Sequence, residues 1–213
     1  MIYKLPLARI IKGRLLKIAE LQDSIIVELS KNFDFVLHGG TAVWRVYGGK
    51  RFSYDIDIYH QNPEQIAKYF SSARISQVLK SKVTPSKVLY LKIGNDVATE
   101  LEASPIFNGV EVTEADFWLV DGSSIVVATL TPESLIEEKI RTFINRKMAK
   151  DLYDIFYLLD FCKKSKIKEE VKNLLPFLTS EPKDFSGLPE LILLGKSPSF
   201  ETIIRKVEIY AKD

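Results

Sequence analysis

The sequence lacks the residues and motifs on which several large protein classes depend. Its 213 residues include one cysteine and two histidines, which excludes an internal disulfide framework and leaves too little histidine for a His-rich metal site. It contains no G-x-x-x-x-G-K-[ST] loop and no G-x-G-x-x-G motif, so the P-loop and Rossmann classes lack their signatures. Neither histidine has a Ser or Cys partner in a recognised nucleophile motif.

Long apolar runs are also missing. The longest unbroken run covers residues 155–159, far short of the roughly 20 residues that span a bilayer. At the N-terminus, basic residues are scattered among the apolar ones, which is typical of an amphipathic helix and not of a signal peptide. We therefore expect no association with a membrane. The single Cys162 fits a reducing, cytoplasmic location and a buried thiol.

Total charge does not decide between classes of partner. The chain has 30 basic and 28 acidic residues, for a net charge of +2, and this neither demands nor excludes nucleic acid, because binding depends on where basic residues cluster. With 46% hydrophobic and 27% charged residues, the composition is that of a globular protein.

Periodicity and turn signals change character near residue 130. The elements expected before it are a helix over 11–29, a strand over 33–37, a helix over 41–47, a strand over 54–59, a helix opening at 62–64, and strand pairs over 88–103 and 117–130. Thr131-Pro132-Glu133 is a helix start, and most of the remaining chain is helical. Strands that do not alternate regularly with helices favour an α+β fold. We expect a mixed sheet flanked by helices over 1–130 and a helical C-terminal subdomain over 131–213.

Two aspartates alternate with apolar residues in the strand expected at 54–59. Residues two apart in a strand share a face, so Asp55 and Asp57 stand side by side while Ile56 and Ile58 face the core. Neighbouring carboxylates repel one another unless a cation lies between them, and Mg²⁺ is commonly held by one or two carboxylates together with substrate phosphates. The alternative is a surface strand with two solvated acids.

A glycine pair precedes this strand. Gly39 and Gly40 lie between an expected strand and an expected helix, where glycine lets backbone N–H groups approach an anion and the helix start favours negative charge. Thr41 can cap that helix or direct its hydroxyl to a phosphate. A glycine pair alone is often only a turn, but next to the acidic strand it indicates a phosphate cradle beside a metal site.

A third carboxylate is expected if two metals stabilise the attacking and leaving oxygens. Glu100 and Glu102 share one face of a later strand, and we favour Glu102, which Leu101 and Ala103 flank. Such a group can act as the base that takes a proton from an acceptor hydroxyl. The alternative is a hairpin whose acidic face is simply solvated.

Basic residues recur in the C-terminal part. Lys139, Arg146 and Lys150 fall within about 40° of one stripe on a continuous helix, with Asp154 close to it. Such a stripe is often only a solvated face, but beside a phosphate site it can neutralise a triphosphate and its leaving pyrophosphate. Arg51 can serve the same purpose or brace the acidic strand.

Two segments resemble a known family. Gly39-Gly40-Thr41, followed after thirteen residues by Asp55-Ile56-Asp57, resembles the first motif of the nucleotidyltransferase superfamily that includes DNA polymerase β. Residues 38–59 and 128–160 together resemble the AbiEii/AbiGii-type nucleotidyltransferase toxin family, with its GG-T opening, R-F-S-x-D-I-D strand and later helix ending in R/K-D-L-Y-D. This chain differs in having Lys150 where many relatives have Arg.

The resemblance implies metal-dependent transfer of a nucleoside monophosphate from an NTP to an acceptor hydroxyl, with release of pyrophosphate and with Mg²⁺ or Mn²⁺ as cofactor. Some relatives are toxins that modify the acceptor end of tRNA and are encoded beside an antitoxin, so RNA and a cognate antitoxin are the implied partners. A small-molecule or protein acceptor, or a non-catalytic relative that only binds nucleotide or RNA, are the alternatives.

The patterns described above and the resemblance together give roles to individual residues. Metal binding falls to Asp55, Asp57 and Glu102. Catalytic roles fall to Asp55, Asp57, Glu102, Lys139 and Asp154. Nucleotide binding falls to Gly39, Gly40, Thr41, Arg51, Ser53, Lys139, Arg146, Lys150 and Asp151.

Overall fold

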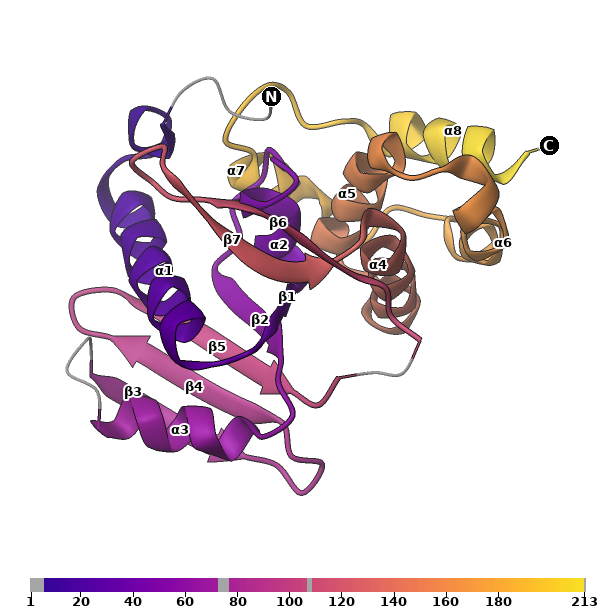
Figure 1. Ribbon diagram of the computed structural model, residues 1–213. Coiled ribbons are helices and arrows are strands. Elements are labelled where there is room, and N and C mark those ends of the chain that lie inside the picture. The colour runs from indigo at the N-terminus through magenta and orange to yellow at the C-terminus, as the bar shows by residue number, and fades with distance from the viewer. Residues whose placement is uncertain (1–5, 73–76, 107–108, 213) are drawn as a thin grey trace. The chain divides into compact units, whose positions relative to one another are not determined.

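The computed structural model of the protein describes residues 6–72, 77–106 and 109–212 (Figure 1). The chain divides into two compact units. The first comprises the residues up to Gly48 together with Ser53–Thr129, and the second comprises Gly49–Phe52 together with the residues from Leu130 onwards.

The first unit is built on a mixed β-sheet. Within the described residues its strands are β1 (Val36–His38), β2 (Asp55–Tyr59), β3 (Val78–Val83), β4 (Leu89–Gly94), β5 (Ala98–Ser104), β6 (Val112–Trp118) and β7 (Ser124–Leu130), in the order β3-β4-β5-β2-β1-β7-β6. The β1/β7 and β2/β5 pairs are parallel, whereas β1/β2, β3/β4 and β4/β5 are antiparallel. Its helices are α1 (Gly13–Asn32), α2 (Gly39–Arg45) and α3 (Pro63–Ser72), preceded by a 3₁₀ turn η1 (Leu7–Arg9). This confirms the expected α+β class with a mixed sheet flanked by helices.

One face of the β2–β5–β4 region is apolar and packed. Along β4, Leu89 and Leu91 are buried while the alternate Tyr90 and Lys92 are exposed, as the two-residue period of a strand requires. Helix α1 packs against β5, and α3 packs against β3 and β4 (Figure 1). Burying the apolar face in this way leaves the opposite face of the same strands to carry polar side chains.

A buried ion pair fixes α2 in place. Arg45, at the end of α2, is fully buried; its guanidinium donates to Asp23 of α1 and, through Nε, to the Trp118 carbonyl at 2.7 Å. Asp23 also accepts a hydrogen bond from the Val120 backbone N–H at 2.7 Å. The guanidinium carbon lies 4.6 Å from the ring centroid of Phe117. The pair therefore ties α1, α2 and β6 together and sets where the start of α2 lies.

The second unit is helical. Its helices are α4 (Pro132–Arg146), α5 (Ala149–Leu158), α6 (Lys164–Leu174), α7 (Leu188–Leu191) and α8 (Phe200–Ala211), with 3₁₀ turns η2 (Leu159–Phe161), η3 (Leu175–Phe177) and η4 (Phe185–Gly187). Thr131 caps α4 by accepting a hydrogen bond from the Ser134 N–H, which bears out the helix start expected there.

The prediction that one continuous helix carries Lys139, Arg146 and Lys150 is wrong. Helix α4 ends at Arg146, Lys147 adopts the left-handed conformation with φ +50°, and α5 begins anew at Ala149. The 3.6-residue period therefore does not extend from α4 to Lys150, and the three residues do not form one helical stripe. No Gly or Pro marks the break, since a lysine occupies the position that usually favours glycine.

Several shorter elements differ from expectation. Strand β1 begins only at Val36, and the following helix occupies Gly39–Arg45 and not 41–47. Strand β3 is an element that the sequence analysis does not include: its apolar and polar residues do not alternate regularly, and all of them except Val78 are exposed. The strand over β2 and the β4–β5 hairpin are confirmed. Within the described ranges, no helix is both long enough and apolar enough to cross a bilayer.

Candidate active site

Strand β2 presents the two aspartates on one face. Asp55 and Asp57 are half-buried, whereas Ile56 and Ile58, on the opposite face, are fully buried. The strand lies between β1 and β5, so its orientation is fixed by backbone hydrogen bonds on both sides. The two carboxylates thus project from a central strand and not from a flexible loop.

Two rows of paired residues cross this face of the sheet. In the first row, Asp57 stands between His38 of β1 and Glu102 of β5, and Glu102 in turn faces Tyr90 of β4. Residues paired directly across strands share a face and have Cβ atoms about 5 Å apart. Glu102 is therefore the acidic neighbour of Asp57.

The second row distinguishes the two glutamates. Glu100 pairs with Asp55 on one side and with Lys92 on the other. Its side chain is 63% exposed and lies 4.0 Å from the Lys92 ammonium, whereas Glu102 is half-buried. The negative charge of Glu102, followed by burial and the charge of Asp57, raises the pKa of Tyr90. The negative field of the first row therefore extends to Tyr90.

Gly39 makes room for Asp57. Its φ is +69°, and a Cβ placed on it would lie 2.0 Å from Asp57 Oδ2, closer than any real contact. Only glycine satisfies both the backbone conformation and the space. The carboxylate of Asp57 thus packs directly against the backbone where α2 begins.

Thr41 and His38 make contacts that join α2 and β1 to strand β2. Thr41 is fully buried and its hydroxyl donates to the backbone carbonyl of Asp55, so it links α2 to β2. It does not cap the helix, because the N-cap position is His38. The His38 ring stacks on Tyr59, with ring centroids 3.8 Å apart. Ser53, just before β2, is buried, and its carbonyl accepts a hydrogen bond from Gln22 Nε2 at 3.0 Å.

The donor set suits a metal that shares its ligands with a substrate. Among the described residues, no group of three His, Cys, Asp or Glu side chains is arranged to hold a metal by itself. Asp55 and Asp57 are adjacent hard oxygen donors, and the missing side chain at Gly39 keeps the space beside Asp57 open to its carboxylate. Mg²⁺ typically takes one or two carboxylates and completes its shell with water and phosphate oxygens, so the two aspartates fit this ion.

The second unit contains a buried network of charges. Arg51 forms a two-pronged ion pair with Asp154, with Nε···Oδ1 at 2.6 Å and Nη2···Oδ2 at 2.5 Å. Lys139 Nζ lies 3.0 Å from Asp154 and 3.7 Å from Asp151. Arg146 forms a second two-pronged pair with Asp151, with both distances at 2.7 Å. Three cations face two carboxylates in this network, and Glu138 adds further negative charge near Lys139.

Burial and charge act in opposite directions on the pKa values of this network. Burial disfavours the carboxylate form of Asp154, but the charges of Arg51 and Lys139 outweigh it and lower the pKa of Asp154 below its ordinary value. Burial likewise disfavours the charged form of Lys139, but Asp154 and Asp151 outweigh it and raise its pKa. Arg51, Lys139 and Asp154 are therefore all ionised at neutral pH, and each is stabilised in its charged form by its ion-pair partners.

The expected site residues fall into two groups. The first unit brings together Gly39, Gly40, Thr41, Asp55, Asp57 and Glu102, and the second unit brings together Arg51, Lys139, Arg146, Asp151 and Asp154. Lys150, on α5, makes no ion pair with a described residue. Sequence reasoning missed Tyr90, whose alternation with Leu89 and Leu91 was the available signal.

We expect Gly39→Ala to lower the catalytic rate of this site by about 100-fold or more, because the added Cβ must displace the Asp57 carboxylate. Gly13→Ala is the matched control: Gly13 also has a positive φ of +59°, but nothing lies within 4 Å of its added Cβ. Both variants carry a similar backbone cost, measured as a shift in thermal unfolding. Equal activities in the two variants would show that the contact with Asp57 does not matter.

The Asp154 network should make the free energy of unfolding depend on pH in the acid range. Because the folded pKa of Asp154 is lowered, its contribution is complete above the ordinary aspartate value of about 4 and is lost as pH falls through the folded value. We expect Asp154→Asn to cost about 3–5 kcal/mol at pH 7, because it leaves buried cations without their partner, and to cost less at pH 3. Urea unfolding between pH 3 and 7 measures the difference.

The control for this experiment is Asp160→Asn. Asp160 also forms an ion pair, with Lys206 at 2.7 Å, but its side chain is 65% exposed. Exposed pairs contribute about 0–1 kcal/mol, so this variant should stay close to the wild type throughout. A cost of Asp154→Asn that is the same at pH 3 and pH 7 would contradict the assigned pKa direction.

Solved structures of other proteins have a similar fold. The fold is similar to the crystal structure of JHP933 from Helicobacter pylori, with a TM-score of 0.66 and 19% identity over 94% of this chain and 91% of that one. It is also similar to the solution structure of the antibiotic-resistance factor ANT(2'')-Ia, with a TM-score of 0.52 and 13% identity over 74% of this chain and 90% of that one. No curated protein sequence matches the chain.

A family pattern covers most of the sequence. Residues 23–196 match the family described as nucleotidyl transferase AbiEii toxin of a type IV toxin–antitoxin system. The matched range includes the glycine pair, both aspartates of β2, Glu102 and the charged network of the second unit. The chain therefore belongs to the AbiEii family of nucleotidyltransferase toxins.

Proposed function

We propose that the protein transfers a nucleoside monophosphate from an NTP to a hydroxyl group of RNA and releases pyrophosphate. Membership of a nucleotidyltransferase family supports the reaction class. The observation that carries the proposal is the acidic row: Asp55 and Asp57 lie side by side on a central strand, and Glu102 pairs with Asp57. Such a fixed group of carboxylates suits phosphoryl chemistry, in which the protein mainly positions and neutralises charge.

The reaction forms one bond and breaks another at the α-phosphorus. The acceptor hydroxyl oxygen attacks this atom, and the bond to the oxygen that bridges to the β-phosphate breaks, so that pyrophosphate leaves with the electron pair. The hydroxyl proton passes to Glu102, directly or through a water molecule. Glu102 suits this role because it is half-buried and adjacent to Asp57.

Asp55 and Asp57 would hold the metal, Mg²⁺ or Mn²⁺. When bound, such an ion would neutralise the negative charge that develops on the leaving pyrophosphate. The role of the chain's own residues is to keep these two carboxylates in a fixed orientation. Thr41 contributes by its hydrogen bond to the Asp55 carbonyl, and Gly39 contributes by leaving space for Asp57.

Each unit contains its own candidate nucleotide-binding residues. Gly39, Gly40 and Ser53 would contact the triphosphate from the first unit. In the second unit, the exposure of Arg146 supports its contact with phosphate, and Lys139 and Lys150 would add positive charge. Asp154 and Arg51 would orient Lys139 through ion pairs that are almost completely buried, and Asp151 would orient Arg146.

Two further proposals concern the cell. A cognate antitoxin protein is the partner that membership of a toxin–antitoxin family supports. A cytoplasmic location is supported by the single cysteine, whose thiol is half-buried, and not fully buried as expected, and has its pKa raised to about 12 by burial and then by nearby glutamates. Such a thiol is unreactive.

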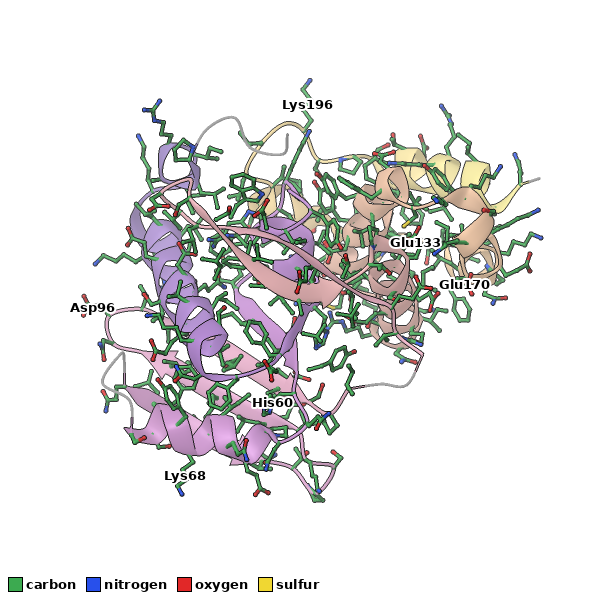
Figure 2. The ribbon with its side chains drawn as sticks, in the orientation of Figure 1. His60, Lys68, Asp96, Glu133, Glu170 and Lys196 are labelled. Atoms are coloured by element: carbon green, nitrogen blue, oxygen red, sulfur yellow. The ribbon has the colours of Figure 1, made fainter. Side chains whose placement is uncertain are left out.

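The proposed activity is tested by incubating the protein with each of four α-labelled NTPs, Mg²⁺ or Mn²⁺, and total RNA, with small hydroxyl compounds offered in parallel. We expect label on RNA, and a loss of at least about 100-fold in Asp57→Asn. Asp96→Asn is the control, since Asp96 is an exposed acid at the β4–β5 turn (Figure 2). The proposal is sunk if no NTP yields labelled RNA, or if Asp57→Asn retains full transfer.

The third carboxylate is identified by comparing Glu102→Gln with Glu100→Gln. We expect Glu102→Gln to lower kcat by about 10²–10⁴-fold, as the loss of a general base does, with a much smaller loss for Glu100→Gln, which pairs with Asp55 but is more exposed. Single-turnover rates at saturating NTP and RNA separate this effect from binding. A larger loss in Glu100→Gln would reassign the role.

A further inference from the structure

The polar face of the sheet continues beyond the carboxylates onto β4 and β3. Beside Glu102 the first row passes to Tyr90 and then to Lys82, and beside Glu100 the second row passes to Lys92 and then to Lys80. Adjacent strands lie about 4.8 Å apart, so Tyr90 is about 10 Å and Lys82 about 14 Å from the β2 position in their row. We call Lys80, Lys82, Tyr90 and Lys92 the lysine–tyrosine face.

An irregularity in β3 turns two of these lysines toward this face. Val78 pairs with the buried Ile93, yet Lys80, two residues later, pairs with Lys92, so Leu79 is an extra residue in the ladder. In a regular strand Lys80 would share the face of Val78. The bulge instead places Lys80 and Lys82 on the side that carries the carboxylates, which is a common use of bulges near active sites.

The lysine–tyrosine face is open and basic. Tyr90 is 43% exposed, the Lys92 side chain is 48% exposed, and the four side chains line a hollow of about 270 Å³ together with Leu91 and Glu100. Glu100 lies 4.0 Å from Lys92. Lys80 and Lys82 make no ion pair with a described carboxylate. The face therefore carries more positive than negative charge at its outer end, next to the acidic row.

Protection of the sheet edge does not account for all of this. Edge strands often carry lysine to prevent pairing with other chains, and β3 is an edge strand. Tyr90 and Lys92, however, lie on β4, which has neighbours on both sides. Edge protection can therefore explain the lysines of β3, but it does not explain the exposed Tyr90 and Lys92 on an inner strand.

We propose that the lysine–tyrosine face binds the single-stranded end of the RNA acceptor, a proposal that rests on the proposed function. The lysines would contact backbone phosphates, and Tyr90 would stack on a base. The 14 Å from Lys82 to β2 accommodates about four nucleotides at the 3.4 Å rise of a stacked strand. The terminal hydroxyl would then lie at the carboxylates. A polycationic small acceptor fits this surface poorly, because the lysines repel it.

The test compares two triple variants of equal charge. The first, Lys80→Gln with Lys82→Gln and Lys92→Gln, removes the positive charge of the face. The second, Lys12→Gln with Lys17→Gln and Lys68→Gln, removes three exposed lysines from α1, its N-cap and α3; Lys68 projects outward from α3 (Figure 2). Affinity for a fluorescein-labelled, 12-nucleotide single-stranded RNA is measured by anisotropy over a range of salt concentrations.

We expect the first triple variant to bind the RNA at least about tenfold more weakly and to reduce the slope of log Kd against log salt by about two, as three lost phosphate contacts predict. The second should stay within about twofold of the wild type. Tyr90→Leu should weaken binding by at least about fivefold, whereas Tyr90→Phe, which retains the ring, should not.

Transfer kinetics separate docking from chemistry. In the first triple variant, KM for RNA should rise while KM for NTP and kcat at saturating RNA stay unchanged. Equal losses in both triple variants, no loss in either, or a fall in kcat alone would each overturn the proposal. So would an increase in KM for a protein acceptor with none for RNA. If the wild type transfers no nucleotide but the affinity pattern holds, the proposed function fails and RNA binding by the face stands.

Discussion

The pairing register of β2 is the constraint on which the candidate site depends. The strand is hydrogen-bonded to β1 on one side and to β5 on the other, and this places Asp57 between His38 and Glu102. Because side chains alternate between faces, a slip of one residue would bring Ile56 and Ile58 to the polar face and bury both aspartates. Such a slip would bury charge and expose apolar surface at once, so the register is strongly determined by the core.

The two units solve the problem of concentrated charge differently. In the first, carboxylates are held side by side by backbone pairing and remain half-buried. A cation between them would reduce their mutual repulsion. In the second, the carboxylates of Asp151 and Asp154 are fully buried and form bidentate pairs, with Arg51 almost completely buried and Arg146 about half exposed. The first arrangement places like charges side by side, whereas the second matches opposite charges within the fold.

Much of the candidate site was predictable because it obeys local rules. The alternation around Asp55 and Asp57 predicted their common face, and Thr131 predicted the start of α4. The break after Arg146 was not predictable, because the left-handed residue is Lys147 and not glycine. The partners of Lys139 were likewise hidden, since buried ion pairs depend on tertiary contacts that no periodicity encodes. Strand β3 escaped notice because its bulge interrupts the alternation on which strand prediction relies.

That bulge also determines how β3 tolerates changes in length. Leu79 is the residue of the strand that lacks a cross-strand partner in the β3/β4 ladder, so the strand carries one spare position. Deleting Leu79 would yield a regular ladder in which Lys80 and Lys82 keep their orientation. Deleting Ser81 would also yield a regular ladder, but with Leu79 turned outward and Lys80 turned inward. Two deletions of one residue, only two positions apart, would thus have opposite consequences for the chemistry of this face.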